Sequence, residues 1–102
     1  MVKRIEWSDQ AKKQLRAIKN YYTDQVNSTV ANDLIKDLTD RVSILYQNPK
    51  AGPIEELLPD YSESFRYLVE GNYKIIYWIN HDLITISSVF DCRQNPARMR
   101  VL

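Results

Sequence analysis

The side chains that most often carry acid–base chemistry are few and scattered in this chain. His81 would suit a general acid at neutral pH, but it stands in a predicted turn between Asn80 and Asp82. We therefore expect a solvated turn residue. Glu55 and Glu56 are adjacent in a predicted loop, where neighbouring carboxylates point apart, so we expect a solvated pair and not a catalytic acid and base.

Residues that could act as nucleophiles or metal ligands are equally few. The single cysteine, Cys92, lies beside Arg93; an adjacent cation favours a reactive thiolate, but a plain rim or buried cysteine is the expected role. One cysteine and one histidine cannot build a zinc site, and we expect no metal and no cofactor. With only Gly52 and Gly71, the chain lacks phosphate-cradling loops and the serine nucleophile elbow, which excludes the common kinases and hydrolases.

The bulk composition is that of one ordinary globular domain, which we expect to span residues 1–102. Fourteen Lys and Arg against thirteen Asp and Glu leave a formal charge of +1, so no global field draws the protein to nucleic acid, and any basic site must be local. The N-terminal MVKRIEW contains no apolar signal region, and no apolar run approaches the roughly 20 residues that a membrane span requires. We expect a cytoplasmic protein without a membrane partner.

Two amphipathic helices are predicted in the first half of the chain. Residues 2–7 alternate apolar and charged types, which predicts a short strand, and Ser8 and Asp9 then supply an N-cap and a first-turn acid. Apolar residues follow at steps of three and four to about Gln25. Asn27 restarts the same pattern, which continues until Asn48-Pro49 ends the second helix.

Three antiparallel strands are predicted in the last third, joined by turns at Gly71-Asn72 and at residues 80–82. The proline-rich segment 47–64 predicts an irregular loop with one helical turn at 54–58. The fold class is therefore α+β with the order β-α-α-β-β-β, a helical hairpin packed on a small, mainly antiparallel twisted sheet.

The middle strand alternates large apolar residues on both faces, and we expect one face to pack on the helices. On the opposite face we place Leu68, Ile76 and Trp78 beside Arg66 and Lys74. Such a face would expose an apolar patch bordered by cations, which is typical of a surface that binds a partner.

Several short motifs occur in a characteristic order. They are A-x-x-x-L-x-x-I-x-x-Y from Ala11 to Tyr21, Pro49-x-x-Gly52, Arg66, G-N-Y-K-I-I-Y from Gly71 to Tyr77, and V-F-D-C-R-Q-N-P-A-R from Val89 to Arg98. Together they resemble the RelE/ParE superfamily of small bacterial toxins from type II toxin–antitoxin pairs, over nearly the whole chain. The resemblance implies either a RelE-like, ribosome-dependent mRNA endonuclease or a ParE-like inhibitor of DNA gyrase.

A ribonuclease without a metal needs clustered cations around the scissile phosphate and a group that transfers protons. RelE-like nucleases carry basic residues at alternate positions of the second strand, but this chain has Arg66, Leu68 and Glu70 there. Lys74 and Arg93 stand in suitable places, yet the tail after Arg93 has no tyrosine or histidine. We therefore favour the ParE branch, a toxin that acts by binding, over an enzyme. The alternative is a metal-independent endoribonuclease using Arg66, Lys74 and Arg93.

The ParE resemblance implies a cognate ParD-like antitoxin, a possible hetero-oligomer with it, and DNA gyrase as the target. We predict antitoxin contacts at Leu68, Ile76 and Trp78. The predicted target contacts are Arg66, Lys74, Arg93, Arg98 and Arg100. Two alternatives stay open: the strand cations are rim residues or partners of Glu70 and Asp91, and the protein is an inactive relative that binds only antitoxin.

Overall fold

A computed structural model describes residues 2–58 and 64–99. The elements are strand β1 (Arg4–Trp7), helices α1 (Asp9–Gln25) and α2 (Ser28–Ser43), the short 3-10 helix η1 (Ile44–Tyr46), strands β2 (Arg66–Glu70), β3 (Tyr73–Asn80) and β4 (Leu83–Asp91), and the short 3-10 helix η2 (Pro96–Arg98). The predicted order and fold class are confirmed. Among the described residues, no helix has the length and apolar character needed to cross a membrane.

Side-chain caps fix where both long helices begin. The Ser8 Oγ accepts a hydrogen bond from the Ala11 amide at 3.0 Å, and the Asn27 Oδ1 accepts one from the Val30 amide at 2.8 Å. Each cap satisfies one of the amides that the first helical turn leaves without an intrahelical partner. These local contacts explain why the helices begin where the sequence predicts.

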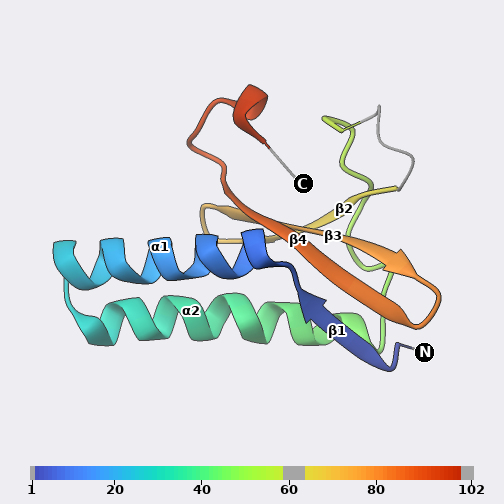
Figure 1. Ribbon diagram of the computed structural model, residues 1–102, viewed down its shortest axis with the longest axis horizontal. Coiled ribbons are helices and arrows are strands. Elements are labelled where there is room, and N and C mark those ends of the chain that lie inside the picture. Colours follow the sequence, from blue (N-terminus) through green and yellow to red (C-terminus); the bar gives the residue numbers. More distant parts are fainter. Residues whose placement is uncertain (1, 59–63, 100–102) are drawn as a thin grey trace.

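The four strands form one sheet in the order β1-β4-β3-β2. The short β1 pairs with β4 in parallel, and the other pairs are antiparallel. Figure 1 shows the sheet twisting across the helical hairpin, with both long helices on one side of it. The C-terminal tail lies on the other side.

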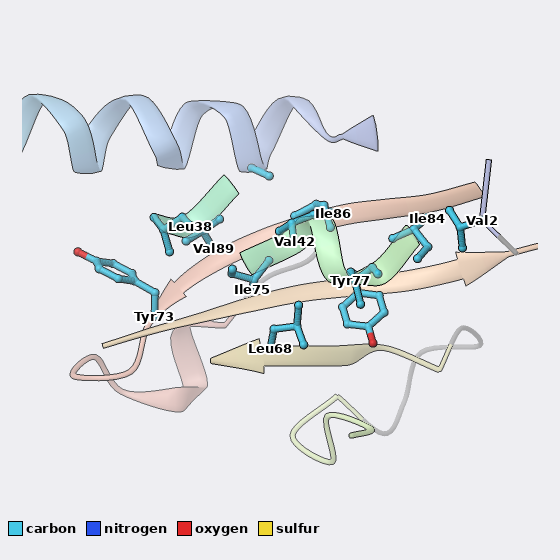
Figure 2. Packing of buried hydrophobic residues seen from close by; sticks show 12 residues of the cluster. Val2, Leu38, Val42, Leu68, Tyr73, Ile75, Tyr77, Ile84, Ile86 and Val89 are labelled. Carbon is cyan, nitrogen blue, oxygen red and sulfur yellow. The ribbon is translucent and has the colours of Figure 1, made fainter. Parts of the chain in front are cut away.

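The main core fills the space between the helices and the sheet. Figure 2 shows Leu38 and Val42 of α2 facing Ile75 of β3 and Ile86 of β4, and all four are at most 3% exposed. Each such fully buried side chain stabilises the fold by about 1.5–3 kcal/mol relative to an exposed one. This cluster holds the hairpin on the sheet and so fixes the position of α1 relative to β4.

Two tight turns set the strand register. Gly71 and His81 have positive φ angles of 57° and 58°, and both turns leave two residues between paired strand ends. A positive φ at this position suits the twist of a two-residue hairpin loop. His81 is exposed, so the predictions of both turns and of a solvated His81 are confirmed.

A β-bulge in β4 joins the sheet to α1. The pairing of β3 with β4 shifts by one residue, so that Ser87 has no residue opposite it. Its carbonyl oxygen accepts hydrogen bonds from the Ser8 Oγ at 3.0 Å and the Gln10 Nε2 at 3.1 Å. The irregularity in the strand therefore provides an anchor for the start of the helix.

The helical turn predicted at 54–58 is present only from Glu55, where the Leu58 amide donates to the Glu55 carbonyl at 3.3 Å. Ile54 instead forms an isolated antiparallel bridge with Arg66, the Glu55 amide donates to the Phe65 carbonyl at 2.7 Å, and the Tyr67 amide donates to the Pro53 carbonyl at 3.1 Å. The segment is extended up to Glu55 because it satisfies polar groups along the outer edge of β2.

The exposed apolar patch predicted from Leu68, Ile76 and Trp78 is also wrong. Leu68 pairs with Ile75 across the Gly71-Asn72 turn, so it faces the helices and is only 3% exposed. Ile76 faces the other way but is fully buried. Phe65, Phe90 and Met99 form a second cluster with Ile76, against which the partly buried Leu58, Tyr67 and Trp78 pack. The loop and the tail therefore cover the face that the sequence left open.

Candidate functional site

Arg66 is held by the loop before β2. Its Nη1 donates to the Gly52 carbonyl at 2.8 Å. On the same face, the Tyr77 hydroxyl accepts from the Gly52 amide at 3.0 Å and donates to the Pro49 carbonyl at 2.8 Å. Burial raises the pKa of the Tyr77 hydroxyl above its ordinary value. We call this set of contacts the Gly52 clamp; it fastens the loop to the sheet.

Lys74 belongs to a partly buried ion pair on the opposite face. Its Nζ lies 2.7 Å from the Glu55 Oε2, and the two side chains are only 21% and 3% exposed. The Glu55 Oε1 also accepts from the Leu57 amide at 3.1 Å, and the Lys74 Nζ lies 4.4 Å from the centre of the Tyr67 ring. The prediction that Glu55 is solvated is wrong, because its carboxylate is the partner of Lys74; Glu56 is exposed, as predicted.

The structure does not bring Arg66, Lys74 and Arg93 together. Arg66 pairs with Tyr77 and Lys74 pairs with Val69 across the β2–β3 register, which places the two side chains on opposite faces. Arg93 follows the end of β4. Among the described residues, no group of three or more His, Cys, Asp or Glu side chains lies close enough to hold a metal ion. Arg100 lies outside the described residues.

Arg93 forms an ion pair with Asp91, as one of the two open interpretations predicts. The Arg93 Nη2 lies 2.8 Å from the Asp91 Oδ2, and its Nε lies 3.0 Å from the Asp91 Oδ1. Hydrogen bonds from Arg93 hold the pKa of Asp91 below its ordinary value. A hydrogen bond with Tyr73, and then one with Arg93, lowers the pKa of Tyr22, whereas burial raises the pKa of Tyr73. Tyr22 and Tyr73 therefore influence each other's titration, and Arg93 links them to Asp91.

This pair makes the acid stability of the protein depend on Arg93. Because the pKa of Asp91 is lower in the folded state, the carboxylate stabilises the fold above its ordinary pKa of about 3.9, and this contribution disappears as the pH falls through the folded pKa. We expect Arg93→Gln to lose less stability than the wild type between neutral pH and about pH 3, as measured by urea unfolding. Arg4→Gln, which breaks an exposed pair with Glu6, is the control and should keep the wild-type pH dependence. An unchanged dependence in Arg93→Gln would contradict the assignment.

A groove of about 500 Å³ lies beside the Arg93–Asp91 pair. Residues of α1, including Gln14, Ile18 and Tyr21, form one wall, and Arg93 and Arg98 lie in the other. The Gln14 Oε1 accepts from the Val89 amide at 2.7 Å, which ties α1 to the part of β4 beyond β1. The residues of α1 were not among the predicted contacts, although Gln14 and Tyr21 stand on the helix face next to its apolar stripe.

A local cap and one buried side chain shape the tail that carries Arg98. The Asn95 Oδ1 accepts from the Ala97 amide at 3.0 Å and so caps η2, which begins at Pro96. Met99 is buried in the second cluster. Arg98 is exposed, lines the groove and forms no ion pair within the described part of the chain. Cys92, at the start of the tail, is exposed and free.

The arrangement of helical hairpin, sheet and tail occurs in a known class of proteins. The chain is similar to a solved structure described as the chromosomal ParDE TA system from P. aeruginosa, with a TM-score of 0.72 and 19% sequence identity. The match covers 86% of this chain and 94% of that chain. No curated protein matches the chain.

A model of the family described as "ParE toxin of type II toxin-antitoxin system, parDE" matches residues 5–96. The chain therefore belongs to the ParE toxin family. It is the toxin component of a type II toxin–antitoxin system, whose partner is an antitoxin.

Proposed function

We propose that this ParE toxin inhibits DNA gyrase by binding to it, without cleaving a substrate, and that the cognate antitoxin neutralises it. The observation that carries the proposal is the separation of Arg66, Lys74 and Arg93, each of which is held by its own partner. Stabilising the charge of a phosphate during RNA cleavage requires donors aimed at one point. A binding toxin has no such requirement.

The contacts of these three cations also indicate which part of the toxin binds its target. The Arg66 and Lys74 side chains are engaged in contacts that hold the loop to the sheet. Arg93 and Arg98 lie at the surface of the tail, and the Arg93 side chain is 56% exposed. We therefore propose the tail, with Arg93, Arg98 and the undescribed Arg100, as the segment that contacts gyrase. A cytoplasmic target suits a chain whose single cysteine has no disulfide partner.

A supercoiling assay tests the proposal. Purified toxin at micromolar concentration should inhibit gyrase, and the cognate antitoxin added first should restore supercoiling. A translation extract programmed with mRNA is assayed in parallel. Unchanged supercoiling would contradict the proposal. Cleavage of ribosome-bound message that Arg93→Ala abolishes would establish the endonuclease instead, whereas antitoxin binding with neither activity would identify an inactive relative.

A further inference from the structure

The groove between α1 and the tail has the size and shape of a site for part of another chain. Its volume of about 500 Å³ lies within the range of roughly 300–1,000 Å³ that is usual for binding clefts. Its walls come from α1, from the end of β4 and from the tail, and the Gln14 contact with Val89 and the burial of Met99 fix these walls in place.

The charges of the groove suit a single carboxylate. Its lining contains two arginines, Arg93 and Arg98, and one acid, Asp91, so it carries one net positive charge. Asp91 already occupies the Nε and Nη2 of Arg93, whereas no described acid pairs with Arg98. A guanidinium offers five donors in a planar fork, so Arg98 presents donors in the geometry that a carboxylate accepts. A polyanion such as DNA fits less well, because its binding requires several neutralised phosphates.

The apolar part of the lining suits an aliphatic side chain beside that carboxylate. Ile18, Val89 and Phe90 line the groove together with Ala17. At its rim, Tyr21 is 59% exposed, and its ring packs edge-on against Tyr22 with 5.1 Å between ring centres. Tyrosine is one of the residue types that most often carry binding energy at protein interfaces. The groove thus offers one cationic and one apolar subsite to the same segment.

We propose that this groove binds a segment of the antitoxin in which an aspartate or glutamate stands next to an aliphatic residue. The carboxylate pairs with Arg98, and the aliphatic side chain packs on Ile18 and Phe90. In this position the segment covers Arg93 and Arg98. The inference rests on the proposed function, since it explains neutralisation as the covering of the same tail arginines that contact gyrase.

Charge reversal at Arg98 tests the proposal. We expect Arg98→Glu to bind the cognate antitoxin roughly 30-fold more weakly than the wild type, because a direct charge pair is replaced by a repulsion. The matched control is Lys13→Glu, the same charge change at an exposed position of α1 that does not line the groove, and its affinity should stay within about twofold of wild type. Isothermal titration calorimetry measures both. Equal affinities of Arg98→Glu and wild type would overturn the proposal.

Two further measurements make the result specific. Ala17→Glu should also weaken antitoxin binding, because it places an acid and added bulk in the groove while keeping a good helix former. The acidic residues of the antitoxin are replaced by arginine one at a time. One of these substitutions should restore binding to the Arg98→Glu toxin. If no reversal restores binding, or if Arg98→Glu weakens only the binding of duplex DNA, the proposal is overturned.

The outcomes separate this inference from the proposed function. The affinity of the antitoxin is measured without gyrase, so a toxin that leaves supercoiling unchanged would contradict only the target. Conversely, suppose that the wild-type toxin inhibits gyrase and that the Arg98→Glu toxin is neutralised by the same antitoxin concentration as the wild type. The proposed function then stands, and the inference fails. A fluorophore on Cys92, the only cysteine and a neighbour of Arg93, should change its emission when the antitoxin enters the groove.

Discussion

Replacing Gly52 by alanine is expected to lower the free energy of unfolding by about 3 kcal/mol, the upper end of the usual cost of overpacking. A Cβ at this position would lie 2.1 Å from the Tyr67 carbonyl oxygen, 2.8 Å from the Tyr67 carbonyl carbon and 3.0 Å from the Tyr77 hydroxyl. Two of these atoms belong to the backbone of β2 and cannot rotate away. The loop or the strand must shift, and urea unfolding followed by circular dichroism measures the loss.

The other glycine is the matched control. Gly71 has a φ of +57°, but no atom lies within 4 Å of the Cβ position. Gly71→Ala therefore costs only the strain of a left-handed backbone, about 1 kcal/mol. If the two variants lose the same stability, close packing is not the reason for glycine at position 52.

The Gly52 clamp gives a structural meaning to motifs that first suggested a function. Pro49-x-x-Gly52, Arg66 and Tyr77 are separated in sequence, yet they meet in one set of hydrogen bonds. A cation on a strand of a toxin is easily interpreted as a binding or catalytic group. Here the Arg66 guanidinium donates to a main-chain carbonyl, and its contact helps to hold a long loop on a small sheet.

The helices and turns are predictable because their determinants are local. Ser8 and Asn27 cap the helices through amides three residues away. Gly71 and His81 take up the positive φ that a two-residue turn needs. Such contacts are present in any short window of the sequence, so periodicity and capping residues suffice to place the elements.

The side of the sheet to which each β2 side chain points was predictable as well, but only if the residue pairs of β2 and β3 are counted outward from the turn. With two residues in the turn at 71–72, Glu70 pairs with Tyr73, and the register then places Leu68 opposite Ile75 and Arg66 opposite Tyr77. Leu68 must therefore face the helices. The bulge at Ser87 also interrupts the apolar pattern of β4. Ile84 and Ile86 are buried and two residues apart, but the next buried apolar residue, Val89, follows three residues later.

The groove could not be predicted, because it depends on contacts between distant segments. Gln14 and Val89 are 75 residues apart in the chain, and their hydrogen bond fixes one wall. The other wall depends on Met99, whose burial follows from the fold of the loop and the sheet around it. No local sequence pattern predicts that Arg98 will lie opposite α1, which is near the other end of the chain.

The ion pair of Lys74 yields the second large prediction. We expect Lys74→Met to lower the free energy of unfolding by about 3 kcal/mol, because it leaves a buried carboxylate without its cation. The Glu55 side chain is 3% exposed and would keep, among the described residues, only the Leu57 amide as a partner. Methionine preserves most of the apolar stem of lysine, so the loss reports the charge and not the packing. Chemical unfolding at neutral pH measures it.

An exposed pair of the same type supplies the control. Lys36 and Asp40 form an ion pair one helical turn apart, with side chains 72% and 61% exposed. Water screens this pair, so Lys36→Met should leave the stability close to that of the wild type. If Lys74→Met is as stable as Lys36→Met, Lys74 is free to act elsewhere and returns to the set of target contacts. If it unfolds as expected, any loss of toxicity in that variant reflects the loop that Glu55 holds on the sheet, and the search for target contacts concentrates on the tail.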